Sequence, residues 1–226
     1  MTVKSKNIID TVVFDLDGTL LDTLDDLRDA ANHVLEKHGL PTVDSDQTRT
    51  AVGNGLRVMM KRIVREGEAH PEFEEILDEF VGYYKEHSSV KTKPYDGIIE
   101  AMRKFSAAGY KLAIVSNKPD VAVKELAKYY FGEFEIAASG ENEKAGIPKK
   151  PSPEMVFESL KTLGTDSAHA VYVGDSDVDI LTARNSGMPC ISVSWGFRTR
   201  DQLETSGASH IISSPCELFD AVAALG

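Results

Sequence analysis

The spacing of hydrophobic and polar positions changes twice along the chain and divides it into three parts. A short run of apolar and β-branched residues at 11–14 predicts a strand that is buried on both faces. From residue 22 to about residue 90, apolar positions recur at helical spacing without a strand signal. From residue 91 onwards, strand and helix patterns alternate up to the C-terminus. The pattern therefore predicts an α/β protein with a helical segment inserted directly after its first strand.

The inserted segment is expected to form four helices. The first has an apolar face from Leu24 to Leu35, can be capped by Asp22 or Thr23, and stops at Gly39. The other three are expected over 46–52, from Leu56 to near Gly67, and from Pro71 to beyond Tyr84.

The alternating part predicts a parallel, doubly wound sheet, because β and α units follow one another with short links. The expected strands cover 111–115, 134–138, 170–173, 190–193 and 210–212. The expected helices cover 98–108, 121–130, 153–163, 178–185 and 216–224. We therefore expect a core domain made of residues 1–21 and 91–226, and a helical domain made of residues 22–90.

Composition narrows the class of protein. With 226 residues, the chain is long enough for one well-buried α/β domain and a smaller second domain. The net charge of −11 argues against nucleic acid or an anionic membrane as a partner, although local cations can still bind a small phosphorylated molecule. No apolar run approaches the ~18 residues of a membrane helix. We interpret Cys190 and Cys216 as reduced thiols, which are typical of cytosolic proteins, and therefore expect a cytoplasmic protein.

Two acids follow the first strand and carry the first chemical signal. Asp15 and Asp17 are spaced i, i+2, which places their side chains on the same side of an extended chain. The two carboxylates of such a pair repel each other unless a cation lies between them. Gly18 allows a sharp turn and Thr19 offers groups that suit an anion. The stretch therefore predicts a divalent metal with a phosphate beside it.

Further polar residues follow other predicted strands. Ser116 and Asn117 follow the second core strand, Lys150 precedes a helix that begins with proline, and Asp175 and Asp179 follow a later strand. Because the carboxyl ends of parallel strands share one edge of a sheet, all of them are expected to open onto the same site. The stretch 195–198 follows another late strand and is expected near the same edge.

Taken in order, these clusters resemble the four motifs of the haloacid dehalogenase superfamily. The resemblance covers the whole chain: Asp-x-Asp-x-Thr at 15–19, a hydroxyl-bearing residue at Ser116, a lysine at Lys150, and an Asp pair four residues apart at 175–179. Within the superfamily, the stretches 16–23 and 52–55 look most like those of the phosphoglycolate phosphatases.

The resemblance implies a set of roles. Asp15 is the nucleophile that takes the phosphoryl group, and Asp17 is the general acid and base. An aspartate at position 17 favours phosphoryl transfer over dehalogenation, because hydrolysis needs a proton carrier. Mg²⁺ is expected on Asp15, the backbone carbonyl of Asp17 and Asp175, with Asp179 helping directly or through water. The phosphoryl oxygens are expected to be held by Lys150, the Ser116 hydroxyl, and the N–H groups of Gly18, Thr19 and Asn117.

The helical segment resembles the α-helical cap of this superfamily and is expected to close over the site. The loop with Asn54 and Gly55, followed by Arg57, is expected to face the substrate. Arg57, Lys61 or Arg62 would then bind a substrate carboxylate.

The function expected from the sequence is a Mg²⁺-dependent phosphatase, monomeric or homodimeric, that acts on a small metabolite such as phosphoglycolate. Several alternatives remain at this stage: a phosphomutase, a pyrophosphatase or nucleotidase, and a phosphonate-cleaving relative that uses Lys61 for a Schiff base. A receiver that only stores an aspartyl phosphate fits less well, because receivers lack an insertion of this length.

Overall fold

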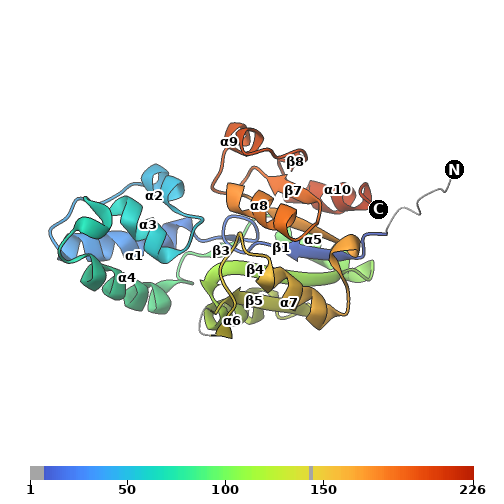
Figure 1. Cartoon of the computed structure of the whole chain (residues 1–226), viewed down its shortest axis with the longest axis horizontal. Helices are drawn as coiled ribbons and strands as arrows, with labels where there is room; N and C mark the ends of the chain where they lie inside the picture. The colour runs from blue at the N-terminus through green and yellow to red at the C-terminus, as the bar shows by residue number, and fades with distance from the viewer. Residues whose placement is uncertain (1–7, 143–144) are drawn as a thin grey trace.

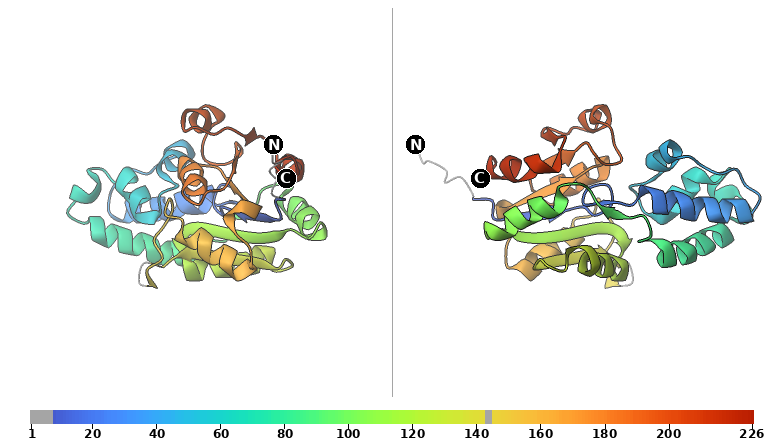
Figure 2. Two further views of the ribbon diagram at one scale, coloured as in Figure 1. Left: turned by 45° about the vertical axis from the view of Figure 1, so that its right-hand side comes forward. Right: turned by 180° about the vertical axis from the view of Figure 1, so that it is seen from behind.

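The computed structural model describes residues 8–142 and 145–226 and consists of two parts (Figure 1). The larger part is a six-stranded sheet with helices on both faces. The smaller part is a group of four helices beyond one end of this sheet, as the views of Figure 2 also show. No helix in the two described ranges is both long and apolar enough to cross a membrane.

The central strand of the sheet is the first strand of the chain. The strands are β1 (Thr11–Phe14), β4 (Lys111–Pro119), β5 (Ile136–Glu141), β6 (Ala170–Gly174), β7 (Cys190–Val193) and β8 (Ile211–Ile212). Their order is β5-β4-β1-β6-β7-β8, and every pair is parallel. The predicted parallel, doubly wound sheet is therefore confirmed. The order reverses beside β1, so the carboxyl ends of β1 and β6 form the switch point where such sheets bind ligands.

The two faces of the sheet are covered by different helices. Val12 and Phe14 pack against α5 (Ile98–Ala107), α6 (Asp120–Phe131) and α10 (Leu218–Ala223). Val13 points to the other face and packs against α7 (Glu154–Leu163) and α8 (Asp177–Asn185). This alternation is the pleat of a strand that is buried on both faces, which explains why 11–14 contains no charged residue.

The four helices of the smaller part are α1 (Leu24–Lys37), α2 (Ser45–Ala51), α3 (Leu56–Ile63) and α4 (Phe73–His87). We call residues 24–87 the helical segment. It has its own apolar cluster, which includes Leu27, Met59 and Phe80. One residue from the larger part, Phe197, belongs to this cluster as well.

The chain enters and leaves the helical segment through a pair of short strands. They are β2 (Leu21–Asp22) and β3 (Lys93–Pro94), which pair antiparallel with Leu21 opposite Pro94. The sequence did not predict this pair, because two residues carry no periodicity. It supports the proposed division at residues 21 and 91, which stays a prediction.

Several other elements differ from the prediction. β4 continues to Pro119 instead of ending at Val115, and β5 begins and ends later than the predicted 134–138. A six-residue helix, α9 (Arg200–Thr205), was not predicted at all. It begins with a capping box formed by Thr199 and Gln202, but Leu203 is its single buried residue, so it shows no helical periodicity.

Candidate active site

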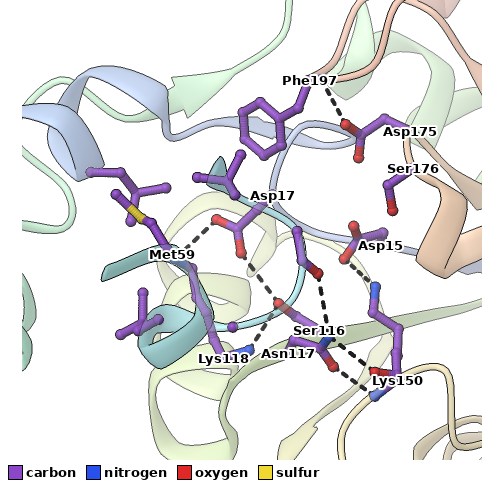
Figure 3. Close-up of a pocket in the computed structure, with 15 residues that line it drawn as sticks. Asp15, Asp17, Met59, Ser116, Asn117, Lys118, Lys150, Asp175, Ser176 and Phe197 are labelled. Carbon is purple, nitrogen blue, oxygen red and sulfur yellow. Dashed lines mark hydrogen bonds and ion pairs between the residues drawn. The ribbon is translucent and has the colours of Figure 1, made fainter. Parts of the chain in front are cut away.

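A pocket lies between the carboxyl edge of the sheet and the helical segment. The sheet side supplies polar residues to its lining, namely Asp15, Asp17, Ser116, Asn117, Lys118, Lys150, Asp175 and Ser176 (Figure 3). The opposite side supplies mainly apolar residues, among them Leu27, Val52, Leu56 and Met59. The predicted convergence at one edge of the sheet thus matches where the structure places these side chains.

Three carboxylates gather at the switch point. Asp15 follows β1 directly, Asp175 follows β6, and Asp179 lies in the first turn of α8. Each offers one oxygen atom, and these atoms all lie within 4.8 Å of one another. The carboxylate of Asp17 is not part of this group.

One ammonium group faces this cluster. Lys150 Nζ lies 2.7 Å from Asp15 Oδ1 and 2.8 Å from Asp179 Oδ1, and it donates to the Tyr172 hydroxyl at 3.2 Å. Burial alone would lower the pKa of Lys150, but the charges of Asp15 and Asp179 outweigh it and raise that pKa. Lys150 is therefore a fully buried, permanently charged cation.

A single lysine does not balance three buried acids. Burial, reinforced by the charge of Asp179, raises the pKa of Asp15 well above its ordinary value, although Lys150 opposes this. The same two causes raise the pKa of Asp175 to about 7. All three carboxylates can ionise together only if more positive charge is present. Closely spaced carboxylate oxygens with that requirement fit a hard divalent cation such as Mg²⁺.

The acids after β6 are held by the start of α8. Ser176 is the N-cap, and its hydroxyl and N–H donate to Asp179 Oδ2 at 2.6 and 3.1 Å. A Cβ atom on Gly174 would lie 2.3 Å from Asp179, so no other residue fits there. Asp175 accepts hydrogen bonds from the Phe197 N–H at 2.7 Å and the Thr19 hydroxyl at 3.2 Å. Both acids are thus fixed before any ligand binds.

Gly18 allows the turn after β1 to approach Asp175. Its φ is +84°, and a Cβ atom there would lie 2.5 Å from Asp175 Oδ2. Its N–H donates to the Leu21 carbonyl at 2.9 Å, and neither Gly18 nor Thr19 lines the pocket. The N–H of Gly18 closes the turn and the Thr19 hydroxyl holds Asp175, and the predicted contact of these two residues with phosphoryl oxygens stays a prediction.

Asp17 faces the pocket from a separate position. Its Oδ2 accepts a hydrogen bond from the Ser116 hydroxyl at 3.2 Å, and its Oδ1 lies 3.0 Å from Lys118 Nζ. Lys118 also donates to the hydroxyl of Tyr84, in α4, at 2.6 Å. The sequence analysis missed Lys118, although it directly follows Ser116 and Asn117.

Asn117 acts on the backbone around Lys150. Its Oδ1 accepts from the Lys150 N–H at 2.6 Å, and its Nδ2 donates to the Lys150 carbonyl at 3.3 Å and to the Gly53 carbonyl at 3.4 Å. The side chain of Asn117 therefore positions Lys150 and touches the loop of the helical segment.

The loop at 53–57 reaches the pocket only in part. Gly53, Gly55 and Leu56 line it, whereas Asn54 accepts a hydrogen bond from Arg62 within the helical segment. Arg57 points away from the pocket.

The outward position of Arg57 follows from the helix. Leu56 and Met59 share the face of α3 that lines the pocket, so Arg57, one residue further along, is rotated away from it. Its guanidinium pairs with Glu74 at 2.6 Å and Glu68 at 3.3 Å, and Lys61 pairs with Glu68 as well. Arg57 thus does not line the pocket in this structure, and its expected role in binding the substrate stays a prediction.

Known proteins resemble this chain in both sequence and fold. The profile of the haloacid dehalogenase-like hydrolases matches residues 12–193. A phosphoglycolate phosphatase of Mesorhizobium japonicum is 36% identical over 192 residues, which are 84% of each chain. An N-acetylmuramic acid 6-phosphate phosphatase of Pseudomonas aeruginosa is 33% identical over 212 residues, 93% of each chain. The crystal structure of a Lactobacillus delbrueckii protein, provisionally assigned as a phosphoglycolate phosphatase, matches with a TM-score of 0.89 at 35% identity and covers 95% of this chain and 98% of that one.

Proposed function

We propose, from the premise that the chain belongs to the haloacid dehalogenase-like hydrolase family, that it is a Mg²⁺-dependent phosphatase whose substrate is phosphoglycolate. The protein is a phosphoric monoester hydrolase, as the sequence predicted. The observation that carries the proposal is the cluster of Asp15, Asp175 and Asp179 around Lys150, which opens onto the pocket beside Asp17.

The first half of the reaction transfers the phosphoryl group to Asp15. A carboxylate oxygen of Asp15 bonds to phosphorus while the ester P–O bond breaks. The departing oxygen takes the proton of the Asp17 carboxyl group and leaves as an alcohol, which is glycolate for phosphoglycolate. The Ser116 hydroxyl and Lys118 hold the Asp17 carboxylate in the pocket for this transfer.

The second half releases phosphate. Asp17, now ionised, takes a proton from a water molecule as the water oxygen bonds to phosphorus. The acyl phosphate bond breaks, Asp15 is restored as a carboxylate, and inorganic phosphate leaves. Lys150 stays within 2.7 Å of Asp15 Oδ1 and so neutralises charge where the phosphoryl group arrives.

The three-acid cluster is where Mg²⁺ would be held, by Asp15, Asp175 and the backbone carbonyl of Asp17, with Asp179 in support. When bound, Mg²⁺ neutralises the phosphoryl oxygens and so makes the attack by a carboxylate possible. The helical segment would act as the cap and exclude water with its apolar side, from Leu27, Leu56 and Met59.

The substrate is argued from the relatives and from the pocket. The relatives named above act on phosphoglycolate and on N-acetylmuramic acid 6-phosphate, both of which combine a phosphate ester with a carboxylate. Lys118 is a cation of the pocket lining outside the three-acid cluster, and a substrate carboxylate would share it with Asp17. The sugar acid phosphate is the second candidate, because that relative is 33% identical over 93% of the chain.

Phosphate release from a panel of substrates tests the proposal. The panel contains phosphoglycolate, N-acetylmuramic acid 6-phosphate, a hexose phosphate, a nucleotide and pyrophosphate, each with Mg²⁺ and with a chelator. The highest kcat/KM is expected for phosphoglycolate, with no release in the chelator. Release that favours another compound would contradict the substrate, and release that survives the chelator would contradict the metal.

We further propose a cytoplasmic protein that is a monomer or a homodimer and binds no nucleic acid. Its Cys190 and Cys216 are free thiols, and the net charge of −11 is unfavourable for nucleic acid.

A further inference from the structure

We propose that Phe197 is a positioning residue that links the seating of the helical segment to Asp175, so that Mg²⁺ binds tightly only when this segment is seated. The inference rests on the proposed function, because it treats Asp175 as part of a Mg²⁺ site. It concerns the stretch 195–198 after β7, which the catalytic steps do not use.

Phe197 contacts both parts of the molecule. Its backbone N–H donates to Asp175 Oδ2 at 2.7 Å, as the dashed line in Figure 3 shows. Its ring is buried, with 4% exposed, and belongs to the apolar cluster of the helical segment. The ring is joined to the backbone of the same residue through Cβ alone, so a shift of the helical segment that carries the ring along pulls on the backbone whose N–H binds Asp175.

Gly196 and Arg198, which flank Phe197, both form hydrogen bonds with the helical segment. Arg49, in α2, donates to the Gly196 carbonyl at 2.9 Å. In the reverse direction, Arg198 donates to the carbonyls of Arg49 and Val52 at 3.3 and 3.0 Å. The two residues that flank Phe197 are thus both attached to residues 49–52 of the helical segment.

The loop has little room to adapt on the side of Asp175. A Cβ atom on Gly196 would lie 2.3 Å from the Gly18 carbonyl oxygen and 2.5 Å from Asp175 Oδ2. Trp195 donates from Nε1 to the Thr19 carbonyl at 3.1 Å, and the Thr19 hydroxyl donates to Asp175 Oδ1. Both oxygens of Asp175 are therefore oriented through this loop or through the turn it rests on.

Hydrogen bonds behind a metal ligand set its orientation, and their loss weakens metal binding by roughly 10- to 100-fold. Because Phe197 gives Asp175 such a bond only from a seated position, metal binding and seating are coupled. Coupling of this kind is reciprocal, so Mg²⁺ should also strengthen the contact between Arg49 and the loop.

Mg²⁺ titration without substrate tests the inference, by calorimetry and by the fluorescence of Trp195, the single tryptophan of the chain. Phe197→Ala removes the ring, and Arg49→Ala removes a contact that touches none of the proposed metal ligands. Arg28→Ala is the matched control, because the guanidinium of Arg28 contacts Ser45, Asp25 and Asp29, all inside the helical segment.

The dissociation constant for Mg²⁺ is expected to rise by about tenfold or more in Phe197→Ala, by several-fold in Arg49→Ala and by less than about twofold in Arg28→Ala. In the wild type, Mg²⁺ should also slow hydrogen exchange at residues 49–52, which a purely structural role of Phe197 would not predict. Unchanged affinity in folded Phe197→Ala and Arg49→Ala, beside normal Mg²⁺-dependent hydrolysis by the wild type, would overturn this inference alone. A wild type that binds no Mg²⁺ would overturn the proposed function with it.

Discussion

Lys118 Nζ lies 3.0 Å from Asp17 Oδ1, and both side chains are largely buried at the carboxyl end of β4. Tyr84 completes this contact from the helical segment, because its hydroxyl accepts a hydrogen bond from Lys118 at 2.6 Å and its ring lies below the ammonium at 4.7 Å. Asp17, the residue proposed to move the proton, is thus held by Lys118, and Lys118 is held in turn by a residue of the helical segment.

Lys118→Met is expected to slow hydrolysis most for substrates with poor leaving groups. Misplacing Asp17 removes general acid catalysis, worth roughly 10²-fold or more, whereas p-nitrophenolate leaves without a proton. We expect kcat/KM to fall by about 10²-fold for an alkyl phosphate and by less than about tenfold for p-nitrophenyl phosphate. Tyr84→Phe should shift the same ratio in the same direction by a smaller factor. Equal losses for both substrates would show that Lys118 has another role.

Asp15→Asn is expected to abolish turnover, with a loss of about 10⁴-fold or more, because an amide is not a nucleophile for phosphorus. Acid quenching of the wild type with labelled substrate should leave label on the protein, and the variant should carry none. Asp201→Asn, at an exposed acid in the first turn of α9, serves as the control and should behave as wild type. Label retained on Asp15→Asn would place the nucleophile elsewhere.

Lys150→Met is expected to destabilise the metal-free protein by about 3 kcal/mol, because removing one partner leaves buried charges without compensation. The side chain of Lys150 is 3% exposed and pairs with two acids. Denaturant titration gives the free energy of unfolding. The same substitution at Lys124, whose pair with Asp120 is on the surface, should cost less than about 1 kcal/mol. Equal costs at the two sites would contradict the account of the buried cluster.

Mg²⁺ binding is expected to strengthen as the pH rises to about 7 and to level off above it. The pKa of Asp175 is raised to about 7 by burial and by Asp179, so the metal must displace a proton below that pH. Calorimetry at pH 5.5, 6.5 and 7.5 should show affinity rising by up to about tenfold per pH unit for each proton released. An affinity independent of pH below 7 would contradict the raised pKa.

The same shift has the opposite consequence for the metal-free fold. The folded-state pKa of Asp175, about 7, lies above its ordinary value of 3.8. The unfolded chain therefore loses this proton first, and the contribution of Asp175 to the free energy of unfolding falls as the pH rises from about 4 to about 7. Thermal unfolding in a chelator should accordingly show a lower melting temperature at pH 7 than at pH 5.5, and saturating Mg²⁺ should reverse that order.

The sequence predicted the sheet and the polar edge well because both depend on local patterns. The apolar run at 11–14 identifies a buried strand, and parallel topology then places Asp15, Lys150 and Asp175 at one edge. The order of these residues along the chain was sufficient for this conclusion.

What the sequence missed depends on partners that are distant in the chain. From the sequence alone, Lys118 resembles a surface lysine. In the structure it is buried between Asp17 and Tyr84, which are distant from it in the chain. Arg57 was expected at the pocket because it follows the loop at 53–55, but its partners Glu68 and Glu74, 11 and 17 residues further along, hold it on the surface. From the sequence, Phe197 looks like an ordinary aromatic that packs in a loop. Its hydrogen bond to Asp175 comes from the backbone N–H, and the type of residue does not predict such a bond.

The pairing of β2 with β3 has a consequence for the descent of such proteins. Because Leu21 lies opposite Pro94, the two points where the polypeptide leaves and rejoins the sheet are neighbours. A lineage can therefore lengthen, shorten or replace the intervening stretch without reopening the hydrophobic layers around β1. Selection can change which molecules are accepted while the chemistry proposed for Asp15 is inherited unaltered.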